Sequence, residues 1–124
     1  MFWISRSKKK SNDYASSELA LIDVLDFRKK SKLKDPKNII FLQCTSPYRD
    51  KNDINNAFKK FEKGNYDSLL SVVSSKKFIW IDRKKIFKPI NYDYKKRPRE
   101  QDFQNFYEEN GSIYITKVCK LRKN

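Results

Sequence analysis

The 124-residue sequence contains no histidine, two cysteines and two glycines. The absence of histidine excludes Ser-His-Asp triads, Cys-His dyads and zinc sites with histidine ligands. The two cysteines, Cys44 and Cys119, cannot complete an all-cysteine zinc site, and we expect them to be reduced thiols. With only Gly64 and Gly111 present, the chain has neither a Walker loop nor a G-x-G-x-x-G dinucleotide fingerprint.

Long hydrophobic runs are also absent, and none approaches the roughly 18–20 residues that cross a bilayer. At the N-terminus a very short apolar stretch precedes the basic residues 8–10, which is the reverse of the order in a signal peptide. Hydrophobic residues nevertheless make up 38% of the chain and aromatic residues 15%, enough to build a core. The composition therefore predicts a folded, cytoplasmic protein with no membrane partner.

Acidic side chains are few, since 15 Asp and Glu stand against 29 Lys and Arg, a formal charge of +14. Such an excess suggests nucleic acid as a partner, because neutralising phosphates drives non-specific binding. The basic residues occur in every segment, however, and 22 of the 29 are lysines, so solvated helix faces explain them better. The runs at residues 8–10 and 94–97 remain candidates for phosphate contacts, including those of a nucleotide.

Strands and helices alternate in the first half of the predicted structure. Short apolar runs predict strands at residues 2–6, 39–42 and 68–73, the second of them buried on both faces of a parallel sheet. Apolar periodicity predicts helices between them, over residues 18–30 and 53–63. This order indicates right-handed βαβ units and an α/β layered domain.

Capping residues support both helices. The candidate N-caps are Asp13, Ser16 and Ser17 for the first helix and Asn52 or Asp53 for the second. Gly64 is expected to end the second helix with a positive φ.

The second half of the sequence predicts a β-hairpin at residues 78–82 and 84–89, then a polar and mobile arm over residues 91–105. A last strand is expected at residues 112–116, with Thr116 capping a terminal helix. We interpret residues 1–124 as a single partial domain. Its parts are a βαβαβ core (1–75), a hairpin with the mobile arm (76–105), and a return strand with a terminal helix (106–124).

Polar side chains follow two of the predicted strands, where parallel sheets bind their ligands. Arg6 follows the first strand and leads to Ser16 and Ser17 at a helix N-terminus, a reasonable anion site. Gln43 follows the second strand, before the Thr-Ser-Pro segment 45–47. The alternative is purely structural, with the serines only capping a helix and residues 45–47 only forming a turn.

Four sequence blocks, in order, favour a functional interpretation. They are DYASS (13–17) after Arg6, FLQCTSPYR (41–49) with DI (53–54), DSLLSV (67–72), and QDF (101–103) with YEENGSIYI (107–115). These blocks resemble the R-P-x-x-L-x-x-D-x-A-S-S, L-Q-P-T-S-P-L-R, D-S-V-V-S-V and R-Q-D-L-P-x-x-Y-x-x-N-G-A-I-Y-I segments of the acylneuraminate cytidylyltransferases, the CMP-sialic acid synthetases. The resemblance covers essentially the whole chain.

The resemblance implies a Rossmann-like nucleotidyltransferase in which a nine-carbon sugar acid attacks the α-phosphate of CTP with the help of Mg²⁺. The products are a CMP-sugar and pyrophosphate. By position, the nucleotide-binding residues are Arg6, Ser16 and Ser17. The residues that bind the sialic-acid-like substrate are Gln43, Arg99, Asn110 and Tyr114. Arg99 would come from an arm that, in this family, reaches across a homodimer.

The chain departs from the family pattern in several places. It has neither the L-A-R-x-G-S-K-x-x-P-x-K-N triphosphate loop nor the I-D-I-D-x-x-x-D segment with the metal-binding aspartates, so it contains no expected catalytic or metal-ligating residue. Cys44 replaces a proline, and Glu100 and Glu108 replace frequent arginines. We therefore expect a central segment of a synthetase that is inactive alone. The alternatives are a non-catalytic remnant or partner-binding subunit, or a basic nucleic-acid-binding module.

Overall fold

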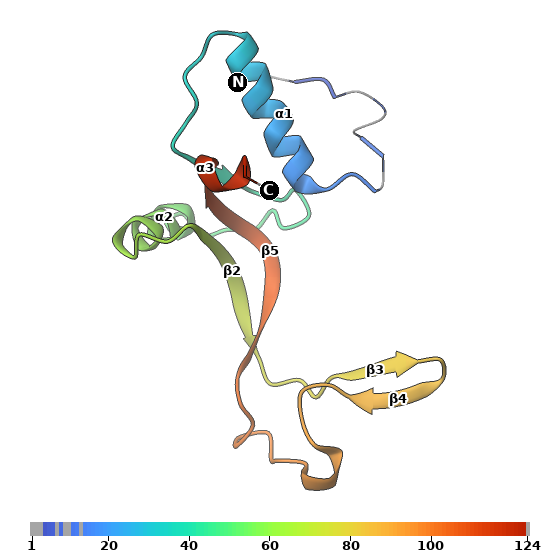
Figure 1. The fold of residues 1–124 in the computed structure, drawn as a ribbon. Helices are drawn as coiled ribbons and strands as arrows, with labels where there is room; N and C mark the ends of the chain where they lie inside the picture. The colour runs from blue at the N-terminus through green and yellow to red at the C-terminus, as the bar shows by residue number, and fades with distance from the viewer. Residues whose placement is uncertain (1–3, 7, 9–10, 13, 124) are drawn as a thin grey trace.

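The computed structural model describes residues 4–6, 8, 11–12 and 14–123. Figure 1 shows three helices gathered at one end of a long β-ribbon and a β-hairpin at the other. The helices are α1 (Ser17–Lys30), α2 (Asp53–Lys63) and α3 (Val118–Leu121), with a 3₁₀ turn, η2 (Tyr94–Lys96). The strands are β1 (Asn38–Phe41), β2 (Ser68–Ser75), β3 (Trp80–Arg83), β4 (Ile86–Pro89) and β5 (Phe106–Lys117).

The main sheet has the order β1-β5-β2, and both of its pairings are antiparallel. The α/β class is therefore confirmed, but the described residues contain no adjacent parallel strands of the Rossmann-like kind. β1 and β2 do run in the same direction, because each is antiparallel to β5. The last strand lies between them because it carries the most buried strand residues, Ile113 and Ile115, which need neighbours on both sides.

β1 was expected to be buried on both faces, and this prediction is wrong. Ile40 keeps 38% of its surface exposed and Leu42, just after the strand, keeps 40%. Among the described residues β1 pairs only with β5, so it is an edge strand with one side uncovered.

Helix α1 ends where predicted and begins one residue earlier, and Ser16 is its N-cap, with Oγ accepting a hydrogen bond from the Leu19 amide. Of the other predicted caps, Ser17 is the first residue of the helix, and Asp13 lies outside the described residues. Helix α2 is also confirmed, but Gly64 ends it with φ −82°, and Asn65 adopts the positive φ instead, at 47°. Glycine at position 64 instead leaves room for the ring of Tyr66, which would have to move if a side chain stood there.

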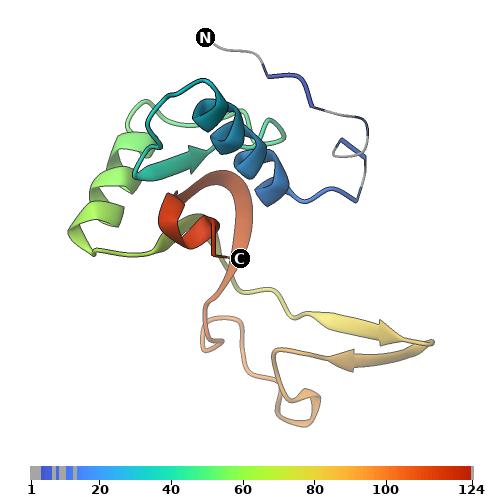
Figure 2. The same cartoon turned by 45° about the horizontal axis from the view of Figure 1, so that its top comes forward.

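Two apolar clusters hold the helices against the sheet. Leu25 of α1 packs with Val118 and Leu121 of α3, so the two helices close one face. Phe61 of α2 packs with Ile113 and Ile115 of β5. Figure 2 shows α1 and α2 lying on either side of the region where β1 meets the end of β5.

The hairpin of β3 and β4 is confirmed at residues 80–83 and 86–89. Its turn places Lys84 and Lys85 at φ 54° and 69°, the conformation of a type I′ turn. Residues 91–105 lead back from it, and within them Phe103 is buried at 7% exposure. Phe103 contacts the rings of Phe78 and Phe106 at centroid distances of 4.5 and 5.4 Å.

Three further expectations concern the chain ends. The last strand is longer than predicted, because the β2 pairing extends it back to Phe106. The N-cap of α3 is Lys117 rather than Thr116. Of the predicted strand at residues 2–6, positions 2 and 3 lie outside the described residues, and Ile4–Arg6 form no strand. Across the described ranges, no helix combines the length and apolar character needed to span a membrane.

Candidate functional site

A bulge in β5 is the structural centre of the candidate site. Leu70 of β2 faces Tyr114 of β5, and two residues later Val72 faces Glu109. Ser71 alone therefore stands opposite the four residues 110–113 of β5. Gly111 lies in this bulge at φ +66°, a left-handed conformation that glycine adopts without strain.

A polar network fills the gap left by the missing ladder bonds. The Ser71 hydroxyl donates to Oδ1 of Asn110 at 2.6 Å and accepts from the amide of Ile113 at 2.8 Å. The same Asn110 oxygen accepts from the amide of Ser112 at 3.1 Å. The bulge is thus held in one shape by side-chain hydrogen bonds.

Arg49 ties the bulge to the end of β1. Its guanidinium donates twice to the carbonyl of Ser112, from Nη2 at 2.8 Å and Nε at 3.2 Å. Nη2 also donates to the carbonyl of Gln43 at 3.1 Å. Because the guanidinium is partly buried and bonds both carbonyls, one side chain fixes the spacing between Gln43 and Ser112, the latter 63 positions beyond Arg49.

Gln43 lies against the backbone of this bulge. A Cβ placed on Gly111 would stand 2.7 Å from Oε1 of Gln43, closer than real carbon atoms approach. The glycine therefore leaves room for the Gln43 side chain as well as permitting the positive φ. This contact links two of the sequence blocks that carry the resemblance.

A cavity of about 730 Å³ opens beside the bulge. It brings together three of the predicted site residues, Ser17, Gln43 and Tyr114. Its other polar lining residues are Glu18, Asp67, Ser68, Glu109, Thr116, Lys120 and Lys123, and its apolar lining comes from Leu21, Phe41, Leu69, Leu70, Ile115 and Leu121. Asn110 is exposed at the bulge, next to Glu109, and is not among the lining residues.

Acidic groups set the electrostatics of the cavity wall. The Tyr114 hydroxyl donates to Oε2 of Glu109 at 3.0 Å, which raises the pKa of Tyr114. At the N-terminus of α1, hydrogen bonds from its own backbone amide and from Ser16 lower the pKa of Glu18. The Tyr114 phenol therefore stays protonated near neutral pH, and the Glu18 carboxyl is ionised.

An ion pair lies in the cavity wall. Asp67 accepts from Lys120 at 2.8 Å and from Lys117 at 3.1 Å, and these bonds lower the pKa of the Asp67 carboxyl. The same contact raises the pKa of Lys120. Lys120 is therefore a cation that is already paired within the cavity wall.

The predicted nucleotide residues do not all meet. Ser17 lines the main cavity, whereas Ser16 is occupied as the cap of α1. Arg6 lies on the other side of α1, 3.6 Å from Asp23, in a separate cavity with Asp26 and Phe27.

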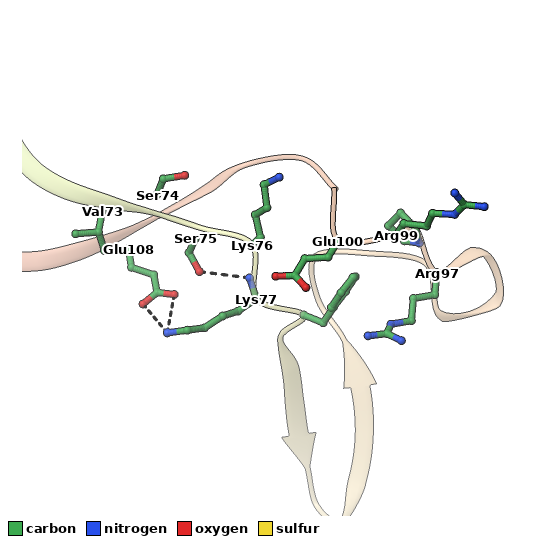
Figure 3. A pocket seen from close by; sticks show the side chains of 11 residues that line it. Val73, Ser74, Ser75, Lys76, Lys77, Arg97, Arg99, Glu100 and Glu108 are labelled. Carbon is green, nitrogen blue, oxygen red and sulfur yellow. Dashed lines mark hydrogen bonds and ion pairs between the residues drawn. The ribbon is translucent and has the colours of Figure 1, made fainter. Parts of the chain in front are cut away.

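Arg99 lies in a third cavity, of about 510 Å³, where the ribbon meets the hairpin. Figure 3 shows Arg97 and Arg99 on one side of Glu100, with Lys77 and Glu108 on the other. Lys77 and Glu108 form an ion pair at 3.2 Å, and hydrogen bonds from Ser75 and Lys77 lower the pKa of Glu108. Within one chain, the β2–β5 ribbon therefore separates Arg99 from Gln43 and Tyr114.

A metal site needs several ligating side chains close together. Over that part of the chain, no three or more Asp, Glu, Cys or His side chains cluster as metal ligands would. The Mg²⁺ that the resemblance implies stays a prediction. Both cysteines are free and exposed.

Two important residues of the site had no predicted role. Arg49 belongs to the block at residues 41–49, and its charge next to a strand end was the available signal. Ser71 interrupts an otherwise apolar run in β2, which is the usual sign of a buried polar partner.

Comparisons with known proteins point to one family, although no family model matches the chain. The chain is 33% identical over 114 residues to the N-acylneuraminate cytidylyltransferase of Oncorhynchus mykiss, an alignment covering 89% of this chain and 25% of that protein. It is 29% identical over 120 residues to N-acylneuraminate cytidylyltransferase A of Danio rerio, an alignment covering 93% of this chain and 27% of that protein. It is 30% identical over 115 residues to N-acylneuraminate cytidylyltransferase B of Danio rerio, with 90% of this chain and 26% of that protein covered.

The chain thus spans about a quarter of the length of the curated relatives it matches. Each alignment extends over about nine-tenths of the chain, as the resemblance does. The resemblance is confirmed, and the chain corresponds in sequence to a segment of the acylneuraminate cytidylyltransferase family.

Proposed function

We propose that the cavity beside the β5 bulge binds a sialic-acid-like nine-carbon sugar acid as part of a CMP-sugar synthetase. In the intact activity the anomeric hydroxyl attacks the α-phosphate of CTP, forming a CMP-sugar and releasing pyrophosphate. The observation that carries the proposal is the contact between Gln43 and Gly111, which joins two family blocks at the mouth of one cavity.

The chemistry of the lining residues suits a sugar. The amide of Gln43 can donate and accept, and the hydroxyl of Tyr114 presents an aromatic face beside a carboxylate. A sugar with many hydroxyls needs such mixed donors and acceptors, whereas a triphosphate needs cations. Ser17 at the start of α1 is the one predicted nucleotide residue within the same cavity.

The nucleotide and metal parts of the activity depend on more than this chain shows. Arg6 and Ser16 stay predictions as CTP contacts, and so does Mg²⁺ as the cofactor of the intact activity. Phosphoryl transfer depends on positioned cations, and the described residues supply no metal cluster. We therefore expect the 124 residues alone to release no pyrophosphate from CTP and a sialic acid. A cytoplasmic location also stays a prediction.

A homodimer, or a partner that supplies further segments, is part of the same proposal. The hairpin exposes Ile86 at 59% and Phe87 at 63%, and β1 leaves one edge unpaired within the described sheet. Arg99 lies at the base of that hairpin, so an arm crossing to a second chain would carry Arg99 toward the other chain's cavity. Sedimentation that shows a compact monomer at all concentrations would argue against this arrangement.

The test of the sugar site is the variant Gln43→Ala in this chain. We expect N-acetylneuraminic acid to bind roughly 10-fold more weakly, as expected when one or two good hydrogen bonds are lost, with CTP affinity and melting temperature unchanged. Calorimetric titration with each ligand measures this. Equal losses for both ligands, together with a lower melting temperature, would mean that Gln43 only pins the turn at residues 45–47.

A nucleic-acid-binding module remains the competing function for so basic a chain. It predicts affinity for DNA or RNA that falls steeply with salt.

A further inference from the structure

We propose that Ser71 is a positioning residue: it orients the Asn110 amide so that its NH₂ group is left free to donate to an acceptor oxygen of the sugar acid. This inference rests on the proposed function and adds to it the role of a second strand and the chemistry of one substrate contact. Ser71 itself would not touch the substrate.

The orientation of the Asn110 amide follows from its partners. Its Oδ1 atom accepts from the Ser112 amide at 3.1 Å, and a backbone amide can only donate. Turning the amide over would place two donors against each other, so the oxygen must face Ser112. The Asn110 oxygen is therefore directed into the bulge.

Ser71 completes this arrangement. Because its Oγ already accepts from the Ile113 amide at 2.8 Å, its own proton is available to donate, and it does so to Asn110 Oδ1 at 2.6 Å. The oxygen of Asn110 thus has two donors, which occupies both of its lone pairs. What Asn110 has left for a ligand is its NH₂ group alone.

The position of Asn110 gives this donor a use. Its neighbour Glu109 lines the cavity, and its other neighbour, Gly111, lies against the Gln43 side chain. Asn110 is exposed rather than covered by protein. A donor in this place complements an acceptor oxygen, such as a carboxylate or an acyl carbonyl, both of which a sialic acid carries.

The experiment uses the full chain and three variants. Ser71→Ala removes both hydrogen bonds, Ser71→Thr keeps the hydroxyl, and Asn110→Asp keeps both accepted bonds but replaces the outward NH₂ by an oxygen. Two quantities are measured by NMR: the hydrogen-exchange rate of the Ser112 amide and the affinity for N-acetylneuraminic acid. Circular dichroism confirms that each variant is folded.

We expect Ser71→Ala to speed exchange at Ser112, whose bond goes to Asn110 and not to Ser71, and to weaken sugar-acid binding roughly 3- to 10-fold. Ser71→Thr should restore both quantities. Asn110→Asp should keep the slow exchange at Ser112 yet bind the sugar acid more weakly than Ser71→Ala does.

Unchanged exchange at Ser112 in Ser71→Ala would overturn the positioning role. Undiminished binding by Asn110→Asp would overturn the outward donor. If the unaltered chain bound no sugar acid while the Ser112 exchange behaved as expected, the proposed function would fail and the orientation of Asn110 by Ser71 would stand. The two inferences can therefore fail separately.

Discussion

The two ends of the molecule are stabilised in different ways. The body (residues 14–75 and 106–123) buries aliphatic and aromatic side chains from distant parts of the chain, such as Leu25 against Val118. The arm (residues 76–105) has instead a group of ring contacts around Phe78 and Phe103, and a hairpin whose Phe87 faces solvent. Within the part of the chain that the structure describes, the β2–β5 ribbon joins the two ends (Figure 1).

The two ends differ in how rigidly they hold the candidate site residues. The cavity lies at the body end of the ribbon, beside the bulge that Arg49 and Ser71 brace from two directions. Arg99 lies at the arm end, among exposed charges and without such a brace. A single chain therefore builds a defined cavity in the body, whereas the arm presents exposed surface.

The largest effect is expected from emptying the body's core. Phe61→Ala should lower the free energy of unfolding by about 3–5 kcal/mol, because Phe61 is 2% exposed and its loss leaves a cavity against Ile113 and Ile115. Phe87→Ala in the arm is the matched control and should change it by less than about 0.5 kcal/mol. Urea unfolding measures both, and equal losses would remove the contrast between body and arm.

A smaller effect is expected at the bulge that joins the sheet to the cavity. Gly111→Ala should lower the free energy of unfolding by about 1–2 kcal/mol, because alanine is strained at the left-handed φ of +66°. The new methyl group would also displace the Gln43 side chain, so sugar-acid affinity should fall with it. Thermal unfolding and ligand titration test the two parts. A variant of unchanged stability would show that the bulge relaxes freely.

The turn of the arm's hairpin can be made more stable by substitution. Lys84→Asn combined with Lys85→Gly gives the Asn-Gly pair preferred in type I′ turns and should stabilise the hairpin by roughly 1 kcal/mol. Lys88→Gly, in the extended strand β4, is the control and should weaken it. Slower hydrogen exchange in residues 80–89 is the expected result. Slowing that spread equally through the body would mean that arm and body unfold as one unit.

The smallest effect concerns pH. Hydrogen bonds from Lys120 and Lys117 hold the Asp67 pKa below the usual 3.8, so the ion pairs stabilise the folded chain above that pH. This stability is lost as pH falls through the lowered pKa of the folded state. The difference in stability between the protein and Asp67→Asn should therefore shrink from pH 6 toward pH 2. The effect is small because the side chain is half-exposed. A difference that is constant with pH would contradict it.

Local features were predictable to the extent that neighbouring residues decide them. The Ser16 cap and the periodicity of residues 19–25 define α1, and the apolar positions of α2 define its buried face. Gly64 was predicted at the right place for the wrong reason, because the close approach of the Tyr66 ring could not be read from spacing. Thr116 was predicted to cap the terminal helix, but it pairs with Ile39 and therefore belongs to β5. This pairing, too, could not be read from spacing along the chain.

By itself, the sequence determined the family, the helices and the hairpin, and it predicted residues for a sugar-acid site. Only the tertiary structure decided that β5 enters antiparallel between β1 and β2, and that Ser71 and Arg49 hold its bulge against Gln43. The physical reason is distance along the chain. Helices and turns arise from neighbours within a few residues, whereas a strand's partner depends on which of several apolar surfaces is buried most completely. Ile113 and Ile115 settle that choice, and the site forms where the β5 ladder is interrupted.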